Sequence, residues 1–220
     1  MAEPQITINP ADVPGNGVYH LLNAAIAPRP IAWVSSLAAD GTPNLAPHSY
    51  TTVFSPNPPI VGFVSVGRKD TLRNVQATGE FVYHIADEAL AERINLTAAD
   101  FPPDVSEFDW ADLTPIPSDL VRTPRVAEAP ISFEATAAEV QQVRNTNNYL
   151  ITGEIVRIHL AERILTGDRI DPAKLRALGR LAGSQFSHLG ELFKMERPTY
   201  RGLLESDAVP MRAPKLRRPR

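Results

Sequence analysis

Three basic or polar side chains stand close together where a strand is expected to give way to a helix: Arg68, Lys69 and Thr71. Backbone N–H groups at the start of a helix lack partners and carry partial positive charge, so this turn can hold a phosphate group. Ser65, near the end of the preceding strand, adds a hydroxyl. Asp70 opposes an anion unless its carboxylate turns away to cap the helix or to pair with a base. The alternative is a capped surface helix with a solvated basic turn.

A second polar segment, residues 44–50, interrupts a strand pattern with a proline. Its members are Asn44, Ala46, Pro47, His48, Ser49 and Tyr50, together with Leu45. Because proline has no N–H for a strand ladder, such a segment lies at a sheet edge and keeps backbone groups unpaired. Those groups can bind the edge of a planar heterocycle. The alternative is an edge strand that prolines protect from pairing with another chain.

Several kinds of catalytic site are missing from the sequence. The absence of cysteine excludes disulfides, iron–sulfur clusters and thiolate nucleophiles. Gly15 and Gly17 begin a dinucleotide-binding pattern, but His20 stands where its third glycine belongs. The five histidines are scattered without the spacing of zinc ligands, so we expect no metal. We expect no catalytic side chain either, and a bound cofactor would then carry the chemistry.

Apolar runs predict the strands that position these segments: residues 31–37, 44–52, 60–66, 81–85, 131–143 and 149–160. Asp40-Gly41 predicts a hairpin turn between the first two strands. Helical spacing predicts short helices over 18–26, after Lys69 with Asp70 or Thr71 as cap and Gly79 as end, over 87–96, and from Asp171-Pro172 onward with Leu175, Leu178 and Leu181 on one face. Many short strands with few helices indicate a mainly β fold, an antiparallel barrel with short peripheral helices.

The length of 220 residues favours one domain, which we place at residues 1–207. Within it, residues 87–130 are acidic and proline-rich, and we expect a surface excursion; a lid or a docking face is the alternative. Residues 208–220 are predicted to be a disordered basic tail. The net charge of −3 argues against a nucleic-acid partner. Without a membrane-length apolar run or a signal peptide, we expect no membrane partner and a cytoplasmic location.

Several segments in matching order resemble the flavin reductase-like, FMN-binding split-barrel family, which includes flavoredoxins and the nitrilotriacetate monooxygenase component B type. The resemblance covers residues 18–200. It is carried by residues 29–36 (RPIAWVSS), 40–41 (DG), 44–50 (NLAPHSY), 55–59 (SPNPP), 69–74 (KDTLRN), 79–81 (GEF), 152–159 (TGEIVRIH) and 180–183 (RLAG).

The resemblance implies an antiparallel Greek-key split barrel that binds FMN non-covalently, and a homodimer with the flavin sites near the subunit interface. Carried over by position, residues 44–51 would hold the isoalloxazine edge, largely through backbone groups. The ribityl phosphate would lie at the turn that contains Ser65, Arg68, Lys69, Asp70 and Thr71. Arg29 and Trp33 lie in the matching first strand and are also candidates.

The function implied is hydride transfer from NAD(P)H to FMN, with electrons passed to an acceptor or to a partner monooxygenase. The alternative is a non-enzymatic FMN-binding electron carrier or flavin-storage protein. Two positions depart from the family pattern. Phe186 stands near a position that is often tyrosine, and His48 stands where relatives often carry an aromatic residue.

Overall fold

The computed structural model describes residues 3–205. Its contacts divide the chain into two units, Met1–Leu189 and Gly190–Arg220. Every strand within the described residues belongs to the first unit, and the described part of the second contains α6 (Tyr200–Glu205). The single domain over 1–207 stays a prediction, and the tail predicted at 208–220 lies outside the described residues. No helix within residues 3–205 is long and apolar enough to cross a membrane.

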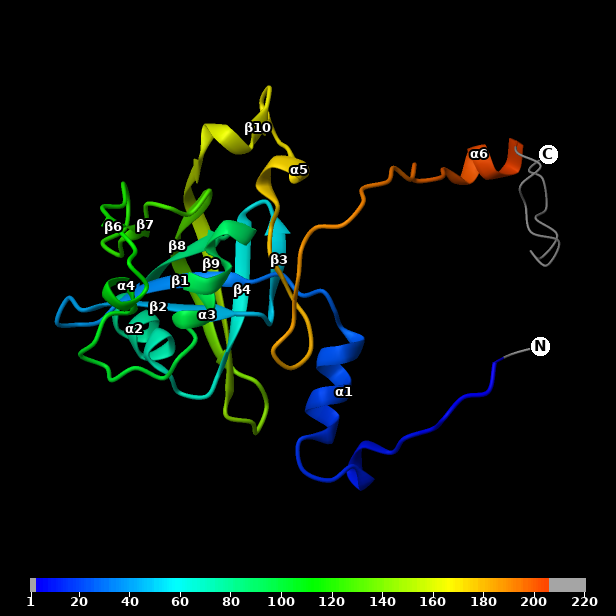
Figure 1. The fold of residues 1–220 in the computed structure, drawn as a ribbon, viewed down its shortest axis with the longest axis horizontal. Coiled ribbons are helices and arrows are strands. Elements are labelled where there is room, and N and C mark those ends of the chain that lie inside the picture. Colours follow the sequence, from blue (N-terminus) through cyan, green and yellow to red (C-terminus); the bar gives the residue numbers. More distant parts are fainter. Residues whose placement is uncertain (1–2, 206–220) are drawn as a thin grey trace. The chain divides into compact units, whose positions relative to one another are not determined.

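Seven antiparallel strands form one curled sheet in the order β2-β1-β5-β8-β9-β4-β3 (Figure 1). Its strands are β1 (Ala32–Leu37), β2 (Pro43–His48), β3 (Thr51–Pro56), β4 (Pro59–Val66), β5 (Glu80–Ile85), β8 (Ile131–Gln142) and β9 (Asn148–Leu160). Three two-stranded ribbons pair β6 (Pro115–Ile116) with β7 (Arg125–Val126), β10 (Leu165–Thr166) with β11 (Arg169–Ile170), and β12 (Gly179–Arg180) with β13 (Phe186–Ser187). The predicted mainly β, antiparallel split-barrel fold is confirmed.

The chain changes sheet edge just after β2, and the single strand predicted over 44–52 is therefore wrong. β2 pairs with β1 as far as His48. Beyond it, the Tyr50 carbonyl accepts a hydrogen bond from β4 (2.8 Å), and Thr51 begins the pairing of β3 with β4. Two consecutive strands thus lie at opposite ends of the strand order, and the crossing between them curls the sheet toward closure.

The helices are short and lie around the sheet (Figure 1). They are α1 (Gly17–Ala25), α2 (Asp70–Thr78), α3 (Ala91–Leu96), α4 (Glu107–Trp110) and α5 (Pro172–Leu175), with 3-10 turns η1 (Pro10–Asp12), η2 (Glu88–Leu90) and η3 (Glu162–Ile164). Gly79 ends α2 as predicted, with the φ of +73° that glycine adopts without a Cβ clash. The predicted cap is wrong, because Lys69 is the N-cap residue and no side chain caps the helix.

The helix predicted from Asp171 begins correctly and ends early. The Asp171 side chain accepts a hydrogen bond from the Ala173 N–H, as a capping residue should. Arg176 then takes a φ of +48° and stops the helix after Leu175. Leu178 lies beyond this helix; its N–H donates to the carbonyl of Ala86, just after β5 (3.4 Å), and its side chain is buried in an apolar cluster with Ile31 and Trp33.

Two apolar clusters lie on the two faces of β1. One fills the barrel and includes Val34, Phe63, Leu72, Phe81 and Ile151. The other joins residues of β1 and β2 to Ile94, Phe108 and Val126 of the acidic stretch. The prediction that 87–130 is a surface excursion is therefore too simple, because its apolar side chains pack against the sheet.

Candidate functional site

A cavity of about 440 Å³ is bounded by β2, the end of β4, the start of α2 and the segment that follows α3. Among the predicted site residues, those that line it are Asn44, Ala46, Pro47, His48, Ser49, Tyr50, Arg68, Lys69, Asp70 and Thr71. The structure thus brings the edge segment and the basic turn together around one space, although β3 and most of β4 separate them along the chain.

The start of α2 offers unpaired backbone donors beside this cavity. Lys69, the N-cap residue, provides no side-chain cap. The first intrahelical bond at this end joins the Arg73 N–H to the Lys69 carbonyl (3.2 Å). The N–H groups of the first turn, at Asp70, Thr71 and Leu72, therefore have no helical carbonyl to bind, which is the usual arrangement of an anion site.

Two basic side chains at this turn already have acidic partners. Lys69 Nζ lies 2.8 Å from Asp100 Oδ1, and Arg73 pairs with Asp70. The hydrogen bond and the charge of Lys69 hold the pKa of Asp100 below its usual value. Asp70 therefore turns to a base, which is what the phosphate interpretation of this turn requires of it.

Arg68 differs from the other two bases. Its guanidinium carbon lies 5.0 Å from the centroid of the Tyr149 ring, a cation–π contact. No carboxylate in residues 3–205 forms an ion pair with it, and it lines the cavity. Among the basic side chains of this turn, Arg68 is thus the one that has no acidic partner within the described residues and is available to an incoming anion.

The edge of β2 is partly occupied by a buried acid of α4. The Leu45 N–H, which points away from β1, donates to Glu107 Oε2 (2.9 Å). The Asn44 side-chain amide is oriented so that both its nitrogen and its oxygen have hydrogen-bond partners. The nitrogen donates to Glu107 Oε1 and the oxygen accepts from Thr71 Oγ1, each at 3.2 Å. Burial raises the pKa of Glu107. The Thr71 hydroxyl therefore links the basic turn to the edge strand.

His48 lies at the inner end of the cavity wall. Its ring is 9% exposed and contacts Phe63, with centroids 4.6 Å apart. Burial lowers the pKa of His48 to about 4, so the imidazole is neutral at pH 7. Its Nε2 has no hydrogen-bond partner among the described residues. His48 contributes a neutral aromatic surface here, not a positive charge.

Two predicted residues have their hydroxyls engaged elsewhere. Ser65 is fully buried and its Oγ donates to the Gly67 carbonyl (2.9 Å), so it stabilises the turn after β4 and does not line the cavity. Thr51 Oγ1 donates to the Gly62 carbonyl (2.7 Å) and lies beyond the cavity wall. Both hydroxyl groups therefore stabilise the strands that position the site.

Trp33 and Arg29 are also absent from the lining of this cavity. Trp33 is fully buried, and its Nε1–H donates to Thr97 Oγ1 (2.9 Å), so it anchors the segment that follows α3. Arg29 lines a smaller neighbouring cavity instead.

Sequence reasoning missed one whole wall of the site. Residues 97–101 and Glu107 come from the acidic stretch, and Tyr19 and Asn23 come from α1. Their only signal was the alternative that the acidic stretch forms a lid. Asn23 is the single buried residue of α1, and its Nδ2 donates to Tyr50 Oη (3.0 Å). That bond ties α1 to the edge segment.

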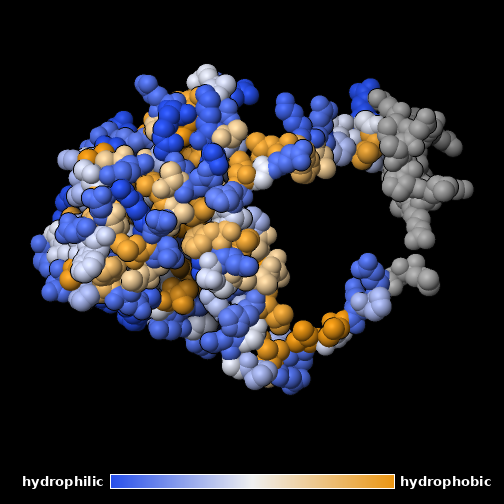
Figure 2. Space-filling view, in the orientation of Figure 1, coloured by the Kyte–Doolittle hydropathy of each residue, from blue (hydrophilic) through white to orange (hydrophobic). Residues whose placement is uncertain are grey.

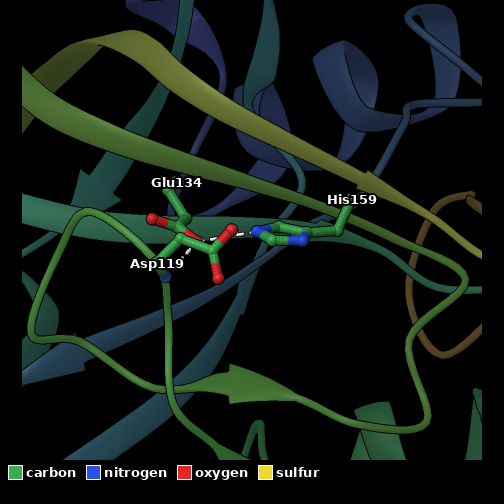
Figure 3. Close-up of side chains that lie close together, drawn as sticks. All are labelled: Asp119, Glu134 and His159. Atoms are coloured by element: carbon green, nitrogen blue, oxygen red, sulfur yellow. Dashed lines mark hydrogen bonds and ion pairs between the residues drawn. The ribbon is translucent and has the colours of Figure 1, made fainter.

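Glu134, His159 and Asp119 form a separate cluster, and their side chains point toward one another in Figure 3. Glu134 Oε1 accepts from His159 Nε2 (2.7 Å) and from the Asp119 N–H (2.8 Å). Its Oε2 accepts from the N–H groups of Leu120 (2.7 Å) and Val121 (3.3 Å). Since both carboxylate oxygens are satisfied by donors, this cluster is a loop anchor and not a metal site.

The chain is similar to several known proteins over most of its length. The flavin reductase like domain family matches residues 24–170. An uncharacterized protein of Halalkalibacterium halodurans, BH2278, is 37% identical over 203 residues, which cover 87% of this chain and 96% of that protein. The nitrilotriacetate monooxygenase component B of Bacillus cereus is 38% identical, with a TM-score of 0.83 over 88% of this chain and 100% of that chain. The 2-nitrobenzoate 2-nitroreductase NbaA of Pseudomonas fluorescens is 28% identical, with a TM-score of 0.82 over 89% of this chain and 98% of that chain. On the extent of these matches, the chain belongs to the flavin reductase-like domain family.

Proposed function

We propose that this chain binds FMN non-covalently and acts as an oxidoreductase in which NAD(P)H reduces the flavin and an acceptor reoxidises it. The observation that carries the proposal is the uncapped start of α2, where Arg68 and Lys69 flank unpaired N–H groups on the wall of a 440 Å³ cavity. Cavities of roughly 300–1,000 Å³ are typical of small-ligand sites. Membership of the flavin reductase-like domain family supports a flavin as the ligand of this cavity.

The residues present fit FMN at both of its ends. At the phosphate end, the first-turn N–H groups of α2 and the guanidinium of Arg68 are the donors, while Lys69 becomes available as its pairing with Asp100 loosens. At the ring end, the cavity is bordered by residues 46–50, and β2, which ends at His48, is paired with a strand on one side only. Pro47 has no backbone N–H. The unpaired edge of β2 therefore presents backbone carbonyls as hydrogen-bond acceptors and few backbone donors.

Bound flavin would supply hydride and single-electron chemistry, and the side chains would supply position. The Trp33–Thr97 bond holds residues 97–101 against the cavity, which limits the access of water. His48 stays neutral at pH 7 and adds a flat, uncharged surface. A non-enzymatic FMN carrier is the second candidate. Only a reductase would bleach the flavin on addition of NADH or NADPH without oxygen.

We also propose that α1 lies in a homodimer interface. The helix buries only Asn23, whereas Tyr19, Leu21, Leu22 and Ile26 are 47–63% exposed. Figure 2 shows hydrophobic surface in the region that α1 occupies in Figure 1. Exposed apolar residues gathered on one element mark an interaction surface. A partner monooxygenase is a further candidate partner.

The dimer is tested by light scattering after size exclusion. Leu22→Lys should yield a monomer, and Leu120→Lys, at a residue 56% exposed on another surface, is the matched control. A monomeric wild-type chain, or a Leu22→Lys dimer as stable as the wild type, would exclude α1 as the interface.

The function is tested with flavin-free chain in two steps. FMN and riboflavin are titrated by flavin fluorescence, and the loaded chain is then mixed anaerobically with NADH or NADPH. We expect tighter binding of FMN than of riboflavin, because only FMN has the phosphate, and rapid bleaching with one of the two nicotinamides. Equal affinity for the two flavins would refute the phosphate site, and binding without bleaching would favour the carrier.

A further inference from the structure

A second, smaller cavity lies beside the first and has a different electrostatic character. Its volume is about 210 Å³, and it shares Tyr19, Asn23, Pro47, Ser49 and Ala98 with the larger cavity. The side chains that are its own come from the start of β1, from α3 and from the β12–β13 ribbon. Nothing in the proposed FMN site requires this space.

Arg29 gives this cavity a buried positive charge. The residue is 7% exposed. Its Nη1 donates to the carbonyls of Asn23 (2.7 Å) and Ile26 (2.9 Å), and its Nη2 donates to the carbonyl of Leu181 (2.9 Å). No carboxylate among the described residues pairs with it. A buried guanidinium that only dipoles compensate favours an anion in the adjoining space.

Arg180 adds a second cation to the same cavity. Its guanidinium carbon lies 4.4 Å from the centroid of the Phe186 ring, and its Nη2 donates to the Gly183 carbonyl. Stacking holds the guanidinium in one orientation and leaves the remaining N–H groups of its planar fork for an acceptor. Within residues 3–205, no carboxylate forms an ion pair with it, and no acidic side chain lines the cavity.

The rest of the wall is largely apolar. Ile31, Ile94, Leu181 and Phe186 line it together with the two arginines. The volume is below the roughly 300–1,000 Å³ of cavities that hold drug-sized ligands, so the space suits a molecule of about one ring. Two cations without an acidic partner among the described residues, together with largely apolar walls, favour a ligand that has both a negative charge and a hydrophobic body.

From these features we propose that the second cavity binds a small monocarboxylate with an apolar body, such as a benzoate-type acid. The carboxylate lies toward the Arg180 fork, in the field of Arg29, and the apolar body packs against Ile31, Ile94 and Leu181. Because this cavity lies next to the larger one, a molecule bound here borders the space assigned to the flavin. The proposal goes beyond flavin binding and holds for the flavin-free chain.

The test measures binding, not activity. Flavin-free chain is titrated by calorimetry with sodium benzoate, with benzamide as the uncharged analogue, and with sodium sulfate as the anion without an apolar body. We expect benzoate to bind at least tenfold more tightly than either of the others. Arg180→Gln should weaken benzoate by about 10- to 100-fold, the range of a lost charge-assisted contact.

Three comparisons make the result specific. Arg180→Lys, which keeps the charge and loses the fork, should weaken benzoate less than Arg180→Gln. Arg169→Gln, at an exposed residue of β11, should leave benzoate binding unchanged. FMN affinity should be the same in wild type and Arg180→Gln, which separates this proposal from the flavin site. Equal binding of benzoate and benzamide, equal binding of benzoate and sulfate, or full benzoate affinity in Arg180→Gln would each overturn the proposal.

Discussion

Arg68→Gln should weaken the binding of FMN and leave the binding of riboflavin unchanged. Arg68 lines the cavity beside the uncapped start of α2 and has no acidic partner in the described part of the chain. A hydrogen bond to a charged group contributes about 1.5–3 kcal/mol. Arg68 is an exposed residue, and solvent screening lowers that to about 1–1.5 kcal/mol. The expected loss is therefore about 5- to 13-fold in the dissociation constant for FMN.

Lys69 serves as the comparison because its charge is already paired. Removing both partners in Lys69→Ala/Asp100→Asn leaves the net charge of the turn unchanged, since the two side chains lie 2.8 Å apart as an ion pair. The double variant should therefore lose less FMN affinity than Arg68→Gln. Asp100→Asn alone should tighten FMN binding, because Lys69 then has no competing acid.

Fluorescence titration of flavin-free chain at low salt measures all three variants, with Arg169→Gln as a surface control. The ratio of FMN to riboflavin affinity is the deciding quantity, because a general disturbance of the fold would weaken both flavins. The reasoning is refuted if the double variant loses more FMN affinity than Arg68→Gln, or if riboflavin affinity falls in parallel.

Buried hydrogen bonds give three more outcomes. Glu134→Ala should lower the free energy of unfolding by about 3 kcal/mol in urea, because three backbone N–H groups lose their acceptor; an unchanged midpoint would contradict this. Burial alone would raise the pKa of Glu134, but the N–H groups and the His159 ring outweigh burial and hold the pKa below its usual value. The stability that the ionised Glu134 adds should therefore be lost below about pH 4.5. Burial lowers the pKa of His84 to about 4, so the unfolded chain binds the extra proton and stability should fall as the pH drops from 6.5 toward 4. Buried His48, whose pKa is also lowered to about 4, adds the same dependence, so His84→Gln should reduce the slope in urea titrations at pH 7 and pH 5 without removing it, and an unaltered slope would exclude His84 as a source. Trp33→Phe removes the bond to Thr97 (2.9 Å) and should weaken FMN and riboflavin alike, by about 3- to 10-fold, whereas a loss confined to FMN would contradict its anchoring role.

Much of the fold is readable in the sequence because local signals agree with one another. Apolar runs correctly predict the long β8–β9 hairpin, and Gly79 correctly predicts the end of α2. The leucines at 175, 178 and 181 suggested a longer helix than forms, because spacing alone does not show that Arg176 adopts a left-handed conformation. Residues 44–52 read as one strand because no local signal marks the change from one sheet edge to the other.

Part of the candidate site could also be predicted, because its segments carry local sequence signals. The basic turn and the edge segment each carry their own residue pattern, and the structure brings both around one cavity, while their role in binding FMN stays a prediction. Ser65 was assigned to the site by its hydroxyl and Thr51 by the family resemblance, and the structure shows their hydroxyls donating to backbone carbonyls. Residues 97–101 were missed because an acidic, proline-containing stretch reads as solvated surface, and only tertiary packing through Trp33 brings it to the cavity.

The two neighbouring cavities divide the positive charge of this region unequally. In the larger one, Lys69 and Arg73 each pair with an acid, so a phosphate there would meet Arg68 as its one unshared cation among the described residues of this cavity and would otherwise exchange one anionic partner for another. Such an exchange yields little net free energy and favours a flavin that can leave as well as enter. In the smaller one, Arg29 donates to backbone carbonyls and to the Ser49 hydroxyl (3.5 Å), and Arg180 has a carbonyl and a ring as partners, so an incoming carboxylate meets charges that no acid among the described residues offsets.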